Sequence, residues 1–235
     1  MPSPRLARAL IVPMALTAAG MAIVAHISPA QAQAQSGAQS GVRQRAQPPA
    51  PAPLTGDLLL VERHLSAMQT LTADFTQTDS HAQQLAGRLT IKSPGRIRFQ
   101  YQPGVPLLIV ADGSALTLID YDVRQVQRWP IRNSPLAVLI DPSANLVRFG
   151  RLRPTLDNQT ISVEVRDPRR PEYGMITMVF QRDQAGPAGL RLYGWVALDA
   201  QRRQTSIRLS SVRYNAPVDD STFRWRDPRP VTHGR

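Results

Sequence analysis

Residues that commonly carry chemistry are few in this sequence and poorly placed for it. Only His64 and His81 lie away from the two ends of the chain, and they lack the spacing of paired metal ligands. Asp79 and Ser80 stand directly beside His81, but neighbouring residues in one loop rarely converge into a catalytic triad. We therefore predict no catalytic residue, no metal and no cofactor, and we expect the protein not to be an enzyme.

The carboxylates do not indicate acid–base chemistry either. Most occur where turns are expected, and an aspartate in a turn usually accepts hydrogen bonds from nearby backbone N–H groups. These residues are Asp112, Asp141, Asp167, Asp219, Asp220 and Asp227. The sequence also has no phosphate-binding glycine loop and no G-x-S-x-G nucleophile motif.

The chain is strongly basic, but its charge is spread out. It has 28 Lys and Arg residues against 17 Asp and Glu, a formal net charge of +11. No block of five or six like charges occurs, and aromatic residues make up only 6 %, which is low for a protein that stacks bases on a basic sheet face. We expect no nucleic-acid partner, while a basic polyanion-binding protein stays an alternative.

Residues 1–34 predict a secretory signal peptide. Arg5 and Arg8 give it a positive start, residues 9–27 are almost wholly apolar, and the small residues that follow place cleavage after Ala32 or Ala34. An uncleaved membrane anchor is the competing interpretation, because the apolar stretch is nearly long enough to span a bilayer. The many alanines and the repeated A-x-A pattern favour cleavage and export.

The remaining chain divides by composition. Residues 35–54 are mainly Gln, Ala, Ser, Gly and Pro, and they cannot bury enough apolar surface to offset the entropy of ordering, so they predict a disordered linker. Residues 55–230 are expected to form one domain with a substantial core. Residues 231–235 are expected to be a tail.

The domain is expected to open with one helix and to continue as strands. The helix is indicated by one apolar stripe, formed by Leu58, Val61, Leu65 and Met68. Alternation then predicts strands over residues 85–92, 97–101, 107–111, 115–120, 125–131, 161–165, 175–180, 190–199 and 205–214. Asp112-Gly113 predicts a hairpin. Since no long helical pattern separates the strands, the fold class is α+β with a mainly antiparallel sheet.

Residues 134–140 interrupt the strands. Ser134 can cap a helix, Pro135 suits its first position, and a short apolar run follows. A second helical turn is expected over residues 144–149. Such short helices can plug a barrel mouth as ordinary core or can form a movable lid, and the pattern alone favours the plug.

Several segments, taken in order, resemble those of one known family. They are Phe75-Thr76-Gln77, the run from Gly87 through Pro94-Gly95 to Tyr101, Val110-Ala111-Asp112-Gly113 with Leu116 and Leu118, Ser134-Pro135-Leu136 with Leu139, and Trp195, Asp199, Gln204, Thr205, Asn215 and Phe223. No segment is specific by itself. Their order and spacing over residues 57–228 are similar to those of the periplasmic outer-membrane lipoprotein carriers, the LolA family.

The resemblance implies an incomplete β-barrel, or half-barrel, of about eleven strands, with short helices as a lid over an apolar cavity. It implies that the cavity takes the acyl chains of a lipoprotein delivered by an inner-membrane ABC release complex, and that the cargo passes to an outer-membrane lipoprotein receptor. We therefore expect a monomeric periplasmic carrier with acylated lipoproteins and these two assemblies as partners. The resemblance also moves the preference from plug to lid.

The residues that face inward in the alternating strands predict the cavity wall. Ordinary barrel core is the alternative for each of them, since buried apolar residues are the rule. The predicted lipid-contacting strand residues are Leu89, Ile91, Phe99, Tyr101, Leu116, Leu118, Ile176, Met178, Phe180 and Trp195. Those of the lid are Leu136, Leu139 and Ile140.

One turn departs from the family pattern. Family members often carry an arginine immediately before the proline of this turn, where it bonds to the lid and holds it closed. Here the position is Ser93. Because serine carries no charge, we expect the lid latch to be weaker or to use Arg96 or Arg98 instead.

The absence of cysteine distinguishes between two roles that this fold can have, diffusible carrier and outer-membrane receptor. The outer-membrane receptor of this system is itself a lipoprotein and needs a cysteine at its mature N-terminus, so the diffusible carrier is favoured. Two alternatives stay open. One is a periplasmic sensor or regulator with the same half-barrel that binds lipid or lipoprotein, and the other is the basic polyanion-binding protein.

Overall fold

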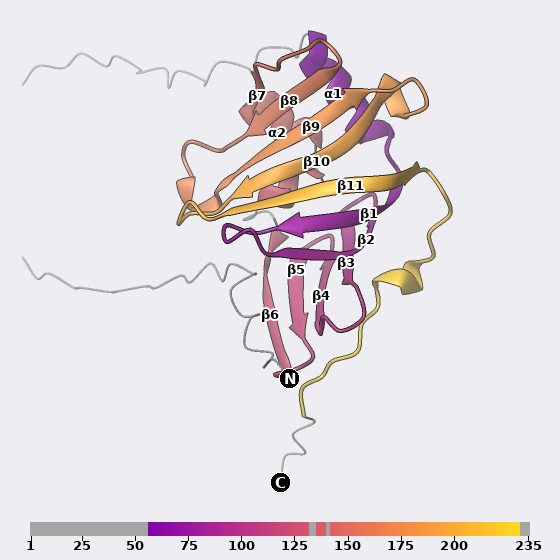
Figure 1. Ribbon diagram of the computed structural model, residues 1–235, viewed down its shortest axis with the longest axis vertical. Helices are drawn as coiled ribbons and strands as arrows, with labels where there is room; N and C mark the ends of the chain where they lie inside the picture. Colours follow the sequence, from indigo (N-terminus) through magenta and orange to yellow (C-terminus); the bar gives the residue numbers. More distant parts are fainter. Residues whose placement is uncertain (1–55, 132–134, 140–141, 231–235) are drawn as a thin grey trace, which may run out of the picture. The chain divides into compact units, whose positions relative to one another are not determined.

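The computed structural model describes residues 56–131, 135–139 and 142–230. Within these ranges eleven strands form one open antiparallel sheet in the order β6-β5-β4-β3-β2-β1-β11-β10-β9-β8-β7 (Figure 1). The predicted fold class, a mainly antiparallel sheet of about eleven strands with short helices, is thereby confirmed. The strands are β1 (Thr70–Thr78), β2 (Gln84–Lys92), β3 (Arg96–Tyr101), β4 (Leu107–Asp112), β5 (Ala115–Asp120), β6 (Gln125–Pro130), β7 (Gly150–Arg153), β8 (Thr160–Val165), β9 (Met175–Arg182), β10 (Leu190–Leu198) and β11 (Gln204–Tyr214).

The helices are short. They are the α-helices α1 (Gly56–Ala67) and α2 (Pro142–Phe149) and the 3₁₀ helices η3 (Pro135–Leu139), η4 (Pro171–Tyr173), η5 (Pro187–Gly189) and η6 (Asp220–Phe223). The predicted stripe of α1 is buried, because Val61, Leu65 and Met68 are at most 4 % exposed. Leu58 is half-buried against the same core.

His64 attaches α1 to the sheet. Its side chain is fully buried, and Nδ1 donates to the carbonyl oxygen of Pro187 at 2.7 Å. The rings of Phe180 and Tyr214 meet the imidazole edge-on, with centroids 5.4 and 5.2 Å away. Burial lowers the pKa of His64, so the imidazole is held neutral. The histidine therefore has a structural position in the core.

Two turns at one end of the sheet pack against each other. In the β4–β5 hairpin, Oδ1 of Asp112 accepts from the N–H groups of Ser114 and Ala115, and Gly113 has a φ of 92°. The β2–β3 turn approaches so closely that a Cβ on Gly95 would stand 2.6 Å from the Cα of Gly113. A side chain at Gly95 would therefore push the two turns apart.

The two faces of the sheet are covered by different parts of the chain. We call the face that packs against α1, η3 and α2 the inner face and the opposite one the outer face. In β3, for example, Ile97 and Phe99 belong to the inner core, whereas Arg96 and Arg98 point outward. Figure 1 shows the helices lying behind strands β7 to β10.

The C-terminal segment, residues 215–230, covers part of the outer face. Its η6 lies against β3 and β4. There Leu108, Val110 and Ile119 form a second apolar cluster with Phe223, and half-buried Trp225 packs against it. We call this set the outer cluster. Because both faces of β4 and β5 are covered, apolar residues run through these strands without alternation.

Candidate functional site

The inner face carries one continuous apolar cluster, which we call the inner cluster. It joins side chains from strands on both sides of the β1–β11 pairing with side chains from α1, η3 and α2. All ten predicted strand residues of the cavity wall belong to it, and none is more than 7 % exposed. They are Leu89, Ile91, Phe99, Tyr101, Leu116, Leu118, Ile176, Met178, Phe180 and Trp195.

The helices η3 and α2, which we call the lid, close over this cluster. Leu139 is 6 % exposed and packs in it, and Leu136 is half-buried against it, which fits both the plug and the lid of the sequence analysis. Ile140, also predicted for the lid, lies outside the described residues. Two lid residues that the sequence did not single out are buried deeper: Val138 is 1 % exposed and Leu146 is 0 % exposed.

Aromatic rings form a connected layer within the inner cluster. Phe75 meets Phe99 and Tyr101 edge-on, each with ring centroids 5.4 Å apart, and Phe99 meets Trp195 at 6.2 Å. Phe75 was not predicted as a site residue, although its alternation with the polar residues of β1 could have identified it. Trp129 on the edge strand β6 also packs against the cluster. The wall is thus wide, and its large rings come from β1, β3, β6, β9 and β10.

One polar pair lies inside this apolar wall. The hydroxyl of Tyr101 donates to Oε1 of Gln77 at 2.8 Å, and both side chains are at most 5 % exposed. Burial raises the pKa of the Tyr101 phenol far above its usual value, so the hydroxyl is neutral and remains a donor. The pair satisfies two polar groups that would otherwise be costly to bury among hydrocarbon.

The two arginines predicted for the lid latch contact the C-terminal segment instead. Arg96 lies 2.6 Å from Asp220, and Arg98 donates to the backbone oxygen of Arg224 at 3.0 Å. The N–H of Ser93 donates to the backbone oxygen of Gln69 at 2.7 Å. Both arginines therefore contact the C-terminal segment on the outer face, away from the lid.

Asp220 is the charged centre of that attachment. It accepts from Lys92 at 2.5 Å as well as from Arg96. Its hydrogen bond to Arg96, with that to Lys92, lowers the pKa of Asp220 to about 2. A surface pocket of about 600 Å³ lies beside this attachment, between the start of β1, Lys92 and residues 215–219. Through these contacts Arg96 and Arg98 attach the C-terminal segment to the outer face of β3.

Two further observations concern the described residues alone. Among them no group of three or more His, Cys, Asp or Glu side chains is arranged to hold a metal ion. In the same ranges, every helix is too short or too polar to cross a bilayer.

Comparison with known proteins gives a family match. The model described as outer membrane lipoprotein carrier protein LolA matches residues 66–226. A protein of Legionella pneumophila strain Lens, named outer-membrane lipoprotein carrier protein, is 34 % identical over 181 residues, covering 73 % of this chain and 86 % of that protein. A protein of the same name from Chromobacterium violaceum is 27 % identical over 176 residues, covering 71 % and 82 %.

Other similarities are more partial. An uncharacterized protein of Rickettsia prowazekii is 32 % identical over 88 residues, which is 37 % of this chain and only 36 % of that protein. Among solved structures, a conserved protein of Thermus thermophilus is 12 % identical with a TM-score of 0.46, covering 72 % of this chain and 94 % of that one. A LolA superfamily protein of Nitrosomonas europaea is also 12 % identical, with a TM-score of 0.41, covering 71 % and 96 %.

Proposed function

The chain belongs to the family of outer membrane lipoprotein carrier proteins, LolA, and we propose that it is a periplasmic carrier of lipoproteins. In this proposal it encloses the acyl chains of lipoproteins released from the inner membrane and delivers them to the outer membrane. Its partners are the acylated cargo, an inner-membrane ABC release complex and an outer-membrane lipoprotein receptor. It works as a monomer, without a cofactor and without catalysing a reaction.

The inner cluster is the observation that carries the proposal. Each buried methylene of an acyl chain gains roughly 0.8 kcal/mol, so a chain of about sixteen carbons is worth about 12 kcal/mol. A carrier must therefore offer a comparable apolar surface and must release it again. The inner face offers such a surface across most of the sheet, and the lid that covers it is two short helices.

Loading requires that the lid exchange its apolar contacts for those of the cargo. The lid contributes three side chains to the inner cluster: Val138, Leu139 and Leu146. When the lid moves away, the strand residues lose these partners and acyl chains can replace them with contacts of the same kind. The thirteen predicted site residues remain proposed lipid contacts on this basis, ten on the strands and three in the predicted lid segment, residues 134–140.

A release assay tests the proposal. Inner-membrane vesicles that hold labelled lipoprotein and an active release complex are energised in the presence of the exported protein, and label is sought in a soluble complex. We expect soluble label with the natural chain and its loss with Leu136→Asp, because a carboxylate on the inner side of the lid opposes burial. Val123→Asp is the matched control, because Val123 is 46 % exposed on the β5–β6 turn.

The opposite result has a defined meaning. If no soluble label appears while a known carrier releases cargo from the same vesicles, the carrier proposal fails. A lipid- or lipoprotein-binding sensor, or a polyanion-binding protein, would then be the function to pursue. A release that Leu136→Asp and Val123→Asp support equally would remove the lid from the mechanism.

A further inference from the structure

The connection between β7 and β8 exposes apolar surface. Every residue from 151 to 159 is exposed. Among them Leu152 is 48 % exposed, and Leu156 is 107 % exposed, as open to solvent as in an isolated peptide. A leucine at full exposure keeps its apolar side chain in water, and burial against another surface would be favourable.

The loop that carries Leu156 is held by its own hydrogen bonds. Oδ1 of Asp157 accepts from the N–H groups of Gln159 and Thr160 at 2.8 and 2.7 Å. The hydroxyl of Thr155 bonds to the backbone oxygen of Asp157 at 2.8 Å. These bonds on either side of Leu156 define the loop and fix its side chain outward at the tip.

The loop is also tied to the rest of the domain. Nε of Arg182, on β9, donates to the backbone oxygen of Asn158 at 2.9 Å. The same guanidinium lies 2.6 Å from Asp57 in the first turn of α1. The loop that carries Leu156 is therefore held to β9 and, through Arg182, to α1.

Arginines accompany this apolar tip. Arg148 lies in the last turn of α2, and Arg151 and Arg153 lie on the edge strand β7, all three exposed. Two carboxylates lie near these three arginines: Asp157 accepts the two loop N–H groups, and Glu164 lies 3.7 Å from the exposed side chain of Arg153 and offsets part of its charge. The balance is positive, as it is for the chain as a whole, at +11.

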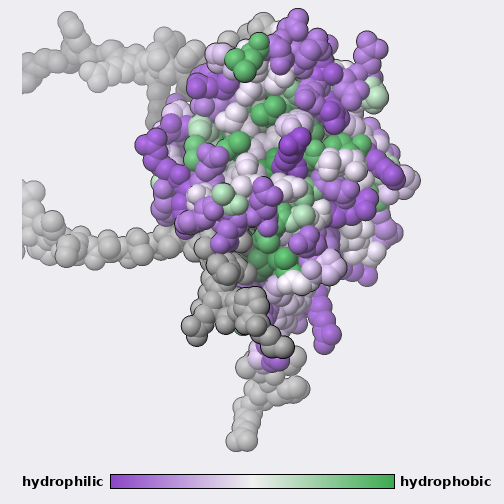
Figure 2. All heavy atoms as spheres, in the orientation of Figure 1, coloured by the Kyte–Doolittle hydropathy of each residue, from purple (hydrophilic) through white to green (hydrophobic). Residues whose placement is uncertain are grey.

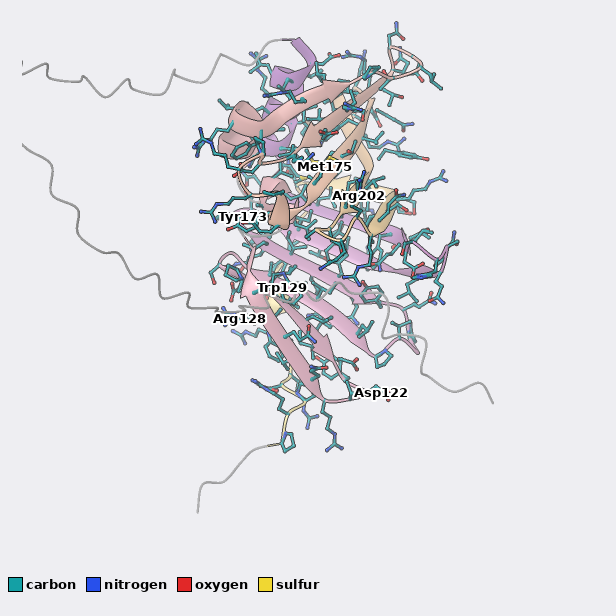
Figure 3. All side chains as sticks on the ribbon, turned by 90° about the vertical axis from the view of Figure 1, so that its left-hand side faces the viewer. Asp122, Arg128, Trp129, Tyr173, Met175 and Arg202 are labelled. Carbon is teal, nitrogen blue, oxygen red and sulfur yellow. The ribbon has the colours of Figure 1, made fainter. Side chains whose placement is uncertain are left out.

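The β5–β6 turn also exposes apolar side chains, but it has no net positive charge. It exposes Tyr121 and Val123, at 37 % and 46 %, but its charged neighbours are Asp120 and Asp122 against the single Arg124. Figure 3 shows Asp122 at the tip of this hairpin, away from Tyr173 and Met175. This turn is therefore a natural control within the same molecule.

From these observations we propose that the β7–β8 loop docks the protein on the surface of an anionic phospholipid bilayer. Leu156 enters the boundary between headgroups and acyl chains, and Arg151 and Arg153 approach the lipid phosphates. The proposal concerns a surface outside the inner cluster, and it does not depend on cargo binding.

Vesicle sedimentation tests this docking. The exported protein is mixed at low ionic strength with vesicles of phosphatidylcholine alone or with added phosphatidylglycerol. We expect binding to the anionic vesicles that declines as salt is added, because screening weakens exposed charges. The double variant Arg151→Gln/Arg153→Gln is expected to weaken binding by roughly fivefold for each arginine, and Leu156→Ser by about tenfold if about half of the leucine leaves water on docking.

Controls make each outcome decisive. Val123→Ser changes a half-exposed residue on the acidic turn and is expected to bind anionic vesicles like the natural chain. Cargo loading by Leu156→Ser is measured alongside in the release assay, so docking and carrier function can fail separately. The proposal is overturned if the natural chain does not bind anionic vesicles, or if Leu156→Ser binds as well as the natural chain. An acidic protein would then be the partner to seek for this loop.

Discussion

The inner and outer faces of the sheet both carry a cover, and the two covers are attached by different forces. On the inner face, Val138, Leu139 and Leu146 of the lid enter an apolar cluster. On the outer face, the C-terminal segment adds to its smaller apolar cluster the ion pairs of Asp220 with Lys92 and Arg96 and the hydrogen bond from Arg98. Figure 2, which looks at the molecule in the orientation of Figure 1, shows how widely hydrophilic residues surround the apolar ones on the exposed surface.

The difference shows how one sheet can hold both a replaceable and a permanent cover. Apolar contacts are not directional, so acyl chains can take the place of lid side chains without matching their geometry. Charged hydrogen bonds require a partner at a fixed distance and angle, and hydrocarbon cannot supply one. In the proposed carrier, the lid is therefore the cover that would exchange with cargo, and the C-terminal segment is the cover that would remain in place.

The largest expected effect is the loss of stability when an aromatic side chain is removed from the inner cluster, which is larger than the outer cluster. Phe99→Ala should lower the free energy of unfolding by about 3–5 kcal/mol, because Phe99 is 4 % exposed and contacts Phe75 and Trp195 within the inner cluster. Phe223→Ala, in the smaller outer cluster, should cost less than about 3 kcal/mol. Urea unfolding of both variants measures the difference, and equal losses would contradict this ranking.

A smaller change should act on the lid alone. Val138→Ala removes two methyl groups that only the closed lid buries, worth about 1.6 kcal/mol, so the equilibrium between closed and open lid should shift by roughly tenfold toward open. Binding of an apolar fluorescent dye should become tighter by a similar factor. Val110→Ala, a matched truncation in the outer cluster, should leave dye binding unchanged; a rise in both variants would indicate general loosening instead.

The smallest effect should appear on the outer face and only in acid. The folded-state pKa of Asp220 is lowered to about 2 from the ordinary value of 3.8. Its contribution is therefore present above the ordinary value and is lost as the pH falls through about 2. We expect Trp225 fluorescence to report partial release of the C-terminal segment over this range, and Asp220→Asn to remove that transition. A transition that persists in Asp220→Asn would assign it to another carboxylate.

Much of the fold could be predicted because apolar and polar residues alternate along most of the strands. Leu89 and Ile91 or Phe99 and Tyr101 identify both a strand and its inner face, and they lie in the inner cluster as the pattern requires. Two strands were not predicted from pattern. In β1 the inward positions include Ala73 and Gln77, which are weak signals, and β7 has only four residues, two of them arginine.

The site was less predictable where partners come from distant parts of the chain. Arg96 and Arg98 were expected at the lid because their sequence position adjoins the family's latch, but alternation places them outward, where residues 215–230 return to meet them. A local pattern cannot show this return. One signal was available: the unbroken apolar run of β4, and that of β5 interrupted only by Thr117, indicate strands buried on both faces, and so a second cover. Whether the wall residues contact lipid stays a prediction.

The central pairing of the sheet has a consequence for the order of folding. β1, the first strand, lies beside β11, the last, with Leu71 opposite Tyr214. Closing so long a loop costs chain entropy before any contact is gained, and such non-local pairing slows folding. The two halves of the inner face cannot be joined until β11 is available, so a nascent chain stays unfinished until nearly all of it has emerged. For the periplasmic carrier that we propose, such a delay would help export, because an incomplete sheet can still cross a membrane as an unfolded chain.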